Sequence, residues 1–371
     1  MPAAAPLPAP ADLPAVAELP DLFALTGGGR VRTRADWERR RAELRELTLH
    51  YEYGPLPPEP GPISARPVRS RRDRRTGTLE RTVHLRMGPG RRLSTHLRLT
   101  VPPGDGPFPA IISGDLNWDG AIPAVVGEVA RRGYVLAEFN RVEIAPDSRD
   151  RAGVYSVFAG YDGGRLAAWA WGFHRVVDYL RTLGWVDGER IAVTGHSRGG
   201  KAALLAGATD ERIALTAPNN SGCGGAGCFR VQGEGSEDIA AIVRAFPYWF
   251  HARFAGLVGQ VERLPFDQHA LKAIVAPRAL LSTEALGDLW ANPRGTQQTY
   301  LAAREVFAFL GVPGRVGIRF RPGVHEQNEE DWWALLDFAD HVLRGKPLAG
   351  DFGRLAFPED APAYSWRAPL A

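Results

Sequence analysis

Apolar and polar positions follow two different patterns along this chain of 371 residues. Residues Leu79–Met87 and Leu93–Val101 alternate apolar and polar side chains on either side of a Gly88-Pro-Gly turn, which predicts an antiparallel strand pair. Before them, Thr33 is a suitable N-cap for a helix that continues to about Tyr53. The first third of the chain therefore predicts a helix followed by a hairpin.

From residue 108 onward, short apolar runs of strand length alternate with stretches of helical periodicity. The predicted strands cover 108–113, 134–139, 191–194, 213–217, 278–282 and 315–320. The predicted helices cover 122–132, 164–183, the stretch after residue 197, segments within 236–260, 297–310 and 329–343. Such an alternation predicts an α/β fold with a mixed, mostly parallel sheet and helices on both faces. We expect a single domain of residues 31–371, preceded by a Pro/Ala-rich segment of residues 1–30.

A Gly-x-Ser-x-Gly motif, Gly195-His-Ser197-Arg-Gly199, lies between one predicted strand and the next predicted helix. This context is typical of the nucleophile elbow of an α/β-hydrolase, in which a strained turn holds the serine at the carboxyl end of the sheet. The flanking glycines allow neighbouring backbone to approach without Cβ clashes. Ser197 is therefore the candidate nucleophile, and the N–H of Arg198 is placed to face an oxyanion.

A serine hydroxyl needs a base, usually a histidine, and in this fold the acid and then the histidine follow the serine along the chain. Four histidines follow Ser197. His325 lies between the last predicted strand and the last predicted helix, where the histidine of this fold belongs. His251 belongs to an aromatic patch and is expected in a pocket wall, His269 is expected to be structural, and His341 lies within the final helix.

The acid of such a triad belongs on the loop after the preceding core strand, where it orients the imidazole. Two carboxylates follow the strand predicted at 278–282, namely Glu284 and Asp288. Asp288 lies at a turn-like Gly-Asp and is the preferred acid. Glu284 remains the alternative acid; the structural interpretation of Glu284 is that it ends the strand and makes local hydrogen bonds.

Composition narrows the classes of protein that this chain can belong to. With 44% hydrophobic and 23% charged residues, it is typical of a soluble globular protein. No apolar run approaches the ~18–20 residues of a membrane span, and the N-terminus lacks a signal-peptide pattern, so the chain is expected to be cytoplasmic or already processed. The net charge is +3, and the Arg-rich run at 66–75 has no accompanying nucleic-acid-binding motif, which predicts a solvated loop or hairpin edge.

The few cysteines and histidines predict neither a disulfide framework nor a metal site. Cys223 and Cys228 are the only cysteines, and we expect free thiols, although a local bridge between them remains open. No cluster has metal-ligand spacing, so neither a metal nor another cofactor is expected.

Lysine usage singles out one position near the candidate nucleophile. Only three of the 45 basic residues are lysines: Lys201, Lys272 and Lys346. Because arginine has replaced lysine elsewhere, Lys201 is a candidate for a function that needs a compact ammonium, such as binding a substrate hydroxyl or carboxylate. The alternative is a solvated lysine in the first helical turn, where the helix dipole mildly disfavours a cation.

The extended elbow, Gly195-His-Ser-Arg-Gly-Gly-Lys201, resembles that of the glucuronoyl esterase family, which reads Gly-Cys-Ser-Arg-x-Gly-Lys. The resemblance covers roughly residues 35–345 and includes 210–218, 221–230, 246–250, 264–269, 276–281 and 288–293. It implies a serine esterase that cleaves esters of glucuronic or 4-O-methylglucuronic acid, including lignin–carbohydrate linkages of glucuronoxylan. It also implies that the Arg198 side chain joins the oxyanion hole and that Lys201 and Trp290 contact the sugar ring.

Two positions depart from that family. Many members carry the triad acid as Glu in Pro-x-Glu-Ser-Gly after the sixth strand, where this chain has Pro218-Asn-Asn220-Ser-Gly. Other members place an acid after the seventh strand, which matches Asp288. The cysteine that precedes the nucleophile, often disulfide-bonded in the family, is His196 here, so that cross-link is absent.

The same motifs leave other functions to be considered. One is a general carboxylesterase, acetyl esterase or peptidase of the same fold, because a fold does not define a substrate. Lys201 and Trp290 favour the uronate, since a general esterase needs no cation and aromatic platform beside its nucleophile. Another is a catalytically inert carbohydrate-binding homologue, against which the Ser197 and His325 pair argues. The expected partner is a small-molecule or oligosaccharide uronate ester, with no nucleic-acid or membrane partner.

Overall fold

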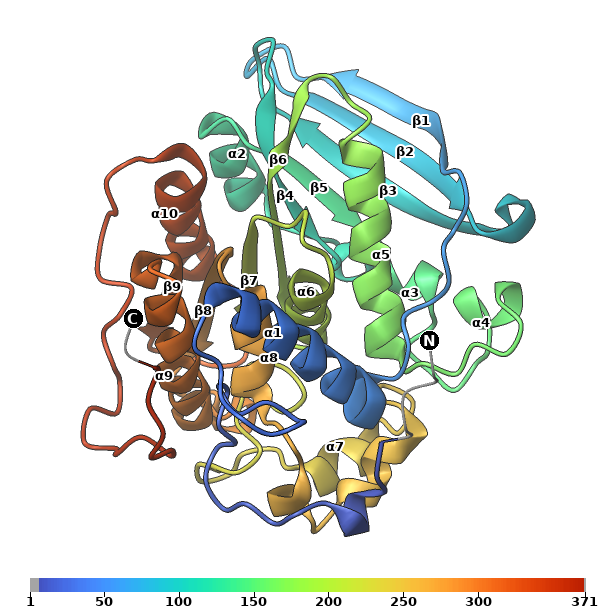
Figure 1. The fold of residues 1–371 in the computed structure, drawn as a ribbon. Helices are drawn as coiled ribbons and strands as arrows, with labels where there is room; N and C mark the ends of the chain where they lie inside the picture. Colours follow the sequence, from blue (N-terminus) through green and yellow to red (C-terminus); the bar gives the residue numbers. More distant parts are fainter. Residues whose placement is uncertain (1–6, 370–371) are drawn as a thin grey trace.

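The computed structural model describes residues 7–369 and is built around one nine-stranded sheet (Figure 1). The strand order is β1-β2-β3-β5-β4-β6-β7-β8-β9. The pairs β1–β2, β2–β3 and β3–β5 are antiparallel, and the strands from β5 to β9 are parallel. The strands are β1 Ser64–Arg72, β2 Leu79–Met87, β3 Leu93–Val101, β4 Phe108–Ser113, β5 Val135–Phe139, β6 Val186–His196, β7 Leu215–Asn219, β8 Ala279–Ala285 and β9 Val316–Arg321.

Helices cover both faces of the parallel part of the sheet. The helices α2 and α10 pack together on one face, and α1, α5, α6, α8 and α9 lie on the other (Figure 1). The helices are α1 Arg34–Thr48, α2 Pro123–Arg131, α3 Arg141–Ile144, α4 Val154–Val157, α5 Arg165–Leu180, α6 Arg198–Thr209, α7 Ile239–Ala245, α8 Gln268–Val275, α9 Pro293–Phe309 and α10 Glu329–Arg344. Shorter turns are η1 Pro10–Asp12, η2 Leu49–Tyr53, η3 Pro89–Arg91, η4 Leu116–Trp118, η5 Ala252–Leu257, η6 Val261–Arg263, η7 Leu289–Ala291 and η8 Pro313–Arg315.

The predicted α/β-hydrolase class is confirmed, and most element positions agree within a few residues. The hairpin of β2 and β3 has the predicted bounds. Thr33 caps α1 in a capping box with Asp36, as its residue type predicts, and a π-helical turn continues the helix to Tyr53. The sequence pattern did not predict the short helices α3 and α4, the helix α8, or β1 as a regular strand.

The strand β1 escaped prediction because it buries almost nothing. All but its first residue are exposed, so no alternation of buried and exposed positions marks it. Its backbone pairs with β2 at the edge of the sheet, so the Arg-rich run is a hairpin edge, one of the two predicted alternatives.

The segment before α1 contributes to the core. Leu19, Leu22 and Phe23 are almost completely buried, and the Phe23 ring packs against Trp366 at a centroid distance of 6.0 Å. In the described part of the chain, no helix is long and apolar enough to cross a membrane.

Candidate active site

The turn between β6 and α6 has the strained geometry that a nucleophile elbow needs. Ser197 adopts φ 54° and ψ −121°, a conformation that costs free energy for a residue with a side chain. Its N–H donates to the Asn219 carbonyl at 3.0 Å, which holds the turn against the end of β7. A Cβ at Gly195 would lie 2.6 Å from the Gly199 backbone, so only glycine fits there. A Cβ at Gly199 would likewise clash with the Asp115 carboxylate.

The structure brings Ser197, His325 and Asp288 into one hydrogen-bonded chain. The distance from His325 Nε2 to Ser197 Oγ is 2.9 Å, and that from His325 Nδ1 to Asp288 Oδ2 is 2.5 Å. The Asp288 side chain is only 3% exposed, whereas that of His325 is 42% exposed. This is the nucleophile–base–acid arrangement of a serine hydrolase, with the base open to an incoming substrate.

The alternative acid, Glu284, makes no hydrogen bond to His325 in the described residues. It is fully buried, and neither of its carboxyl oxygens has a hydrogen-bond partner among the described residues. Burial raises the pKa of Glu284 well above its usual range, and the nearby ammonium of Lys272 only partly opposes this. Glu284 is thus poorly suited to stabilise an imidazolium.

Asn220 occupies the position at which many glucuronoyl esterases carry their acid, and here it has a structural role. Its Oδ1 accepts from the Ala285 N–H at 2.7 Å, and its Nδ2 donates to the Glu326 carbonyl at 3.0 Å. These bonds join the end of β7 to β8 and to the loop that carries His325. Only a side chain that both accepts and donates can make them, which a carboxylate cannot.

Arg198 is held beside the nucleophile by an ion pair and by aromatic rings. Its Nη1 donates to Asp147 Oδ2 at 2.6 Å, and its guanidinium carbon lies 4.7 Å from the Trp249 ring centroid and 5.2 Å from that of Phe246. Its Nε is buried and has no partner among the described residues. A fixed cation with a free donor suits the stabilisation of negative charge near Ser197.

A second ion pair, which the sequence did not reveal, holds the turn between β6 and α6 in place. Asp115 pairs with the fully buried Arg141 and accepts from the His196 N–H at 2.8 Å. The Arg141 guanidinium also lies 4.2 Å from the centroid of the Trp118 ring. No motif could reveal this network, because its members come from the loop after β4, from α3 and from the elbow.

His196, which replaces the family's cysteine, packs directly against the base. The two imidazole rings of His196 and His325 lie 4.5 Å apart at an angle of 48°. His196 Nδ1 is 2.7 Å from Asn219 Oδ1, and burial lowers the pKa of His196. A neutral His196 thus fills the space beside His325 without adding a competing charge.

Lys201 is buried rather than solvated, so the alternative interpretation of this lysine is wrong. It is 4% exposed, and its Nζ donates to the Ser221 and Cys223 carbonyls, each at 2.6 Å. Glu237, which sequence analysis did not single out, lies 4.0 Å from the same Nζ. Burial lowers the pKa of Lys201 and raises that of Glu237, and each opposes the shift of the other. Glu237 follows a Gly/Ser-rich loop with no motif that could have identified it.

These groups surround a small pocket of about 200 Å³, below the size of typical drug-binding sites. Trp290 forms part of its wall and remains 53% exposed, so its ring is available to a ligand. The pocket is lined by Ser197, Arg198, Lys201, Asn220, Ser221, Gly222, Glu237, Phe246, Trp249, Trp290, Ala291 and His325.

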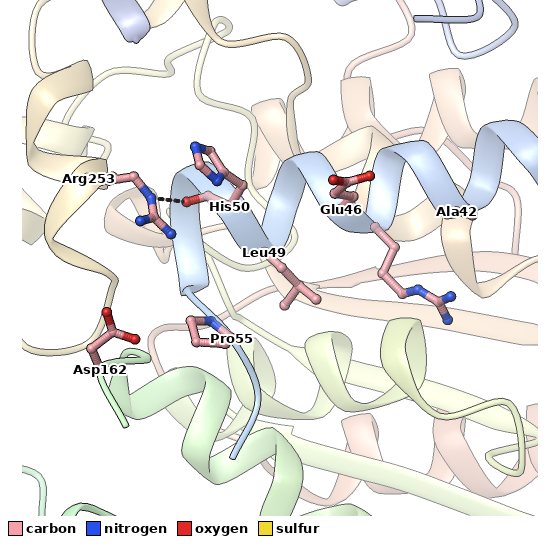
Figure 2. Close-up of a pocket in the computed structure, with 8 residues that line it drawn as sticks. Ala42, Glu46, Leu49, His50, Pro55, Asp162 and Arg253 are labelled. Carbon is pink, nitrogen blue, oxygen red and sulfur yellow. Dashed lines mark hydrogen bonds between the residues drawn. The ribbon is translucent and has the colours of Figure 1, made fainter. Parts of the chain in front are cut away.

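A larger hollow of about 570 Å³ lies elsewhere, at the end of α1 (Figure 2). Arg253 lies beside the end of α1, where its Nε donates to the His50 carbonyl at 2.7 Å, and Asp162 lies on a separate segment nearby. It contains no serine or cysteine beside a base, so it offers none of the chemistry of the smaller pocket.

The remaining candidate chemistry is sparse. Cys223 and Cys228 are both buried free thiols, and burial raises the pKa of each well above its usual range. Within residues 7–369, no group of three or more His, Cys, Asp or Glu side chains is placed to hold a metal ion.

Comparison with known proteins points to one family. Residues 87–311 match the family described as fungal glucuronyl esterase. Over 313 residues the chain is 35% identical to the 4-O-methyl-glucuronoyl methylesterase of Podospora anserina, with 80% of this chain and 61% of that protein covered. The chain thus spans about three fifths of the length of that curated relative.

Solved structures agree with the sequence matches. A carbohydrate esterase family 15 glucuronoyl esterase from Caldicellulosiruptor kristjansonii has a TM-score of 0.82 and 31% identity, with 97% of this chain and 99% of that chain covered. A serine-to-alanine mutant of the glucuronoyl esterase of Sporotrichum thermophile, in complex with methyl 4-O-methyl-β-D-glucopyranuronate, has a TM-score of 0.76 and 29% identity, with 90% of each chain covered.

Proposed function

Because the chain belongs to the glucuronoyl esterase family, we propose that it is a serine esterase that hydrolyses esters of glucuronic or 4-O-methylglucuronic acid. The observation that carries this proposal is the chain of hydrogen bonds from Ser197 through His325 to Asp288, at the mouth of a pocket that holds a buried cation and an exposed tryptophan.

In the first half of the reaction, Ser197 Oγ attacks the ester carbonyl while His325 Nε2 accepts its proton. Asp288 holds the imidazole in the correct tautomer and stabilises the imidazolium that forms. The Arg198 N–H and guanidinium stabilise the oxyanion, whose charge develops only in the transition state. His325 then gives its proton to the leaving alcohol, which leaves a uronoyl ester on Ser197.

In the second half, water replaces the alcohol. His325 takes a proton from the water as it attacks the acyl carbon, the oxyanion forms again beside Arg198, and the proton returns to Ser197 Oγ as the bond to the acid breaks. The products are free uronic acid and a regenerated enzyme.

The pocket walls support selection of the sugar. Lys201 and Glu237 present a cation and an acceptor to the ring hydroxyls, and the exposed face of Trp290 suits the apolar face of a pyranose. A pocket of about 200 Å³ fits one sugar ring rather than an extended chain, so the remainder of a polymeric substrate must lie outside it.

The test is a hydrolysis panel of methyl and benzyl glucuronate against p-nitrophenyl acetate and an aminoacyl anilide. We expect kcat/KM to be highest for the glucuronate esters. A preference for p-nitrophenyl acetate would indicate a general esterase, and cleavage of the anilide would indicate a peptidase. No turnover of any ester and no labelling of Ser197 by a serine-directed phosphonate would indicate an inert homologue.

A further inference from the structure

Although the net charge of the whole chain is close to zero, one region is strongly positive. Residues 64–101, which form β1, β2, β3 and their turns, contain eleven arginines but only two acids, Asp73 and Glu80, for a net charge of +9. Since the chain contains 45 basic and 42 acidic residues, the remainder contains 34 and 40, a net charge of −6. About a tenth of the chain therefore carries a large excess of positive charge.

Most of this charge is solvated and unpaired. The exposed arginines of the region are Arg66, Arg69, Arg71, Arg72, Arg74, Arg75, Arg86, Arg91 and Arg92. Within the described part of the chain, Arg98 is the one arginine of the region with an acidic partner, Glu138, at 2.8 Å. Elsewhere, by contrast, Arg132 and Arg212 each pair with two or more acids. Arg72, Arg86 and Arg92 donate hydrogen bonds to backbone carbonyls, but no acid in the described residues neutralises the charge of these exposed arginines. Like charges that repel each other without a neutralising partner leave the region suited to an external anion.

Strand register gathers part of this charge on one face. On the inner face of β2 and β3, alternate residues such as Val83 and Leu97 are completely buried. Directly opposite residues of antiparallel strands share a face, so the register places the other set outward. We call this outward set the cationic face; its charged and imidazole side chains are Arg66, Arg69, Arg71, Arg86, Arg98, His84 and His96, together with one acid, Glu80, which lies opposite Arg71.

The cationic face is uncovered because β1–β3 extend past the helical layer. The helix α2 packs against β5 and ends the layer on that side, while β1 and β2 form the outer edge of the sheet (Figure 1). Between α2 and the cationic face runs a groove of about 790 Å³, whose lining includes Arg75, Arg98, Thr76 and Thr100. The lining also includes both acids of the region, Asp73 and Glu80.

We propose that the cationic face and this groove bind an acidic polysaccharide through its uronate carboxylates. The choice of partner rests on the proposed function, because a polymer with one esterified uronate in the pocket carries other uronates as free carboxylates. Guanidinium groups bind carboxylates in paired hydrogen bonds, and the threonine hydroxyls and acids of the groove match sugar hydroxyls. The helix α3 lies between this face and the elbow: its Glu143 contacts His96, and its Arg141 pairs with Asp115, which accepts from the His196 N–H.

The groove is less suited to nucleic acid. Its described lining contains no aromatic side chain on which a base could stack. Asp73 and Glu80 would also repel a continuous phosphate backbone within the groove, whereas a polysaccharide places hydroxyls between its more widely spaced charges.

The proposal is tested by binding of de-esterified glucuronoxylan to the full chain in a Ser197→Ala background, which prevents turnover. We expect Arg66→Gln/Arg69→Gln/Arg71→Gln to weaken this binding about tenfold, since each exposed ion pair contributes modestly. The matched control, Arg304→Gln/Arg319→Gln/Arg354→Gln, removes three exposed arginines that have no ion pair in the described residues, and should bind as the parent does.

Two further probes make the outcome decisive. The same xylan with its carboxyls reduced to alcohols should bind as weakly to the parent as the intact polymer binds to the triple β1 variant. Equal binding of both polymers, equal loss in the two triple variants, or tighter binding of single-stranded DNA or of anionic phospholipid vesicles would overturn the proposal. Hydrolysis of methyl glucuronate by the chain with Ser197 intact tests the proposed function separately, because no residue of the cationic face lines the pocket beside Ser197.

Discussion

The arginines near Ser197, at what we call the active edge of the sheet, have the same chemistry as those of the cationic face. They differ in burial and in whether an acid pairs with them. Arg141 is completely buried against Asp115, and Arg198 is held by Asp147 and two aromatic rings. On β1, Arg66 and Arg71 are exposed and unpaired within the described structure. A desolvated, fixed charge acts individually and at short range, whereas solvated charges are screened and act only together.

This contrast predicts that single substitutions at the active edge have large effects and that single substitutions on the cationic face have small ones.

Replacement of the nucleophile should have the largest effect. Ser197→Ala removes the attacking oxygen while keeping a small side chain at the strained turn, so turnover of methyl glucuronate should fall on the order of 10⁴-fold or more with an unchanged melting temperature. Activity near that of the unmodified chain would remove Ser197 from the mechanism.

Asp288→Asn should follow closely. The amide keeps the shape of the side chain but holds the wrong tautomer of His325, a change that lowers kcat about 10⁴-fold in serine proteases. Asn220→Ala is the matched control: it should lower stability through the lost bonds to β8 and the His325 loop, but reduce kcat far less. A larger kcat loss in Glu284→Gln than in Asp288→Asn would assign the acid to Glu284.

Arg198→Gln compared with Arg66→Gln tests the contrast directly, since the same substitution is made in both regions. Loss of one oxyanion donor should lower kcat about 10²- to 10³-fold with a smaller change in KM. Arg66→Gln should leave both constants for methyl glucuronate unchanged. Similar losses in both variants would show that surface charge, rather than local stabilisation of the oxyanion, supports activity.

Lys201→Ala should be selective for the substrate. A hydrogen bond to a charged group contributes roughly 1.5–3 kcal/mol, so kcat/KM for glucuronate esters should fall about 10- to 100-fold, and that for p-nitrophenyl acetate should fall less because it has no sugar. Equal losses on both substrates would mean that Lys201 acts by holding the Ser221 and Cys223 carbonyls.

Ionic strength should have the smallest effect on catalysis. Methyl glucuronate is uncharged and the active-site charges are paired at short range, so kcat/KM should change less than about twofold between about 0.05 and 0.5 M salt. A steep decrease of kcat/KM with salt for this neutral ester would mean that solvated surface charge contributes to catalysis, contrary to the distinction between the two regions.

Local sequence determined the parts of the site that depend on neighbouring residues. The glycines at 195 and 199, the β-branched run before them and the helical pattern after them predict the elbow, because the turn is built within a few residues. The position of His325 after the last strand followed from chain order alone. The hairpin of β2 and β3 was equally predictable, since one of its faces is buried and the other is not.

Only the tertiary structure decided between groups that are equally placed along the chain. Glu284 and Asp288 both lie near the carboxyl end of β8, but packing buries the first without a hydrogen-bond partner in the described residues and directs the second to His325. Glu237 lies beside Lys201 because the loop after β7 folds back over the pocket. The arginines of β1 share a face with those of β2 because the two strands pair in one register. Hydrogen bonds and ion pairs form only over short distances. The tertiary structure sets those distances for segments that are remote in sequence, so the sequence alone does not show which charged groups pair.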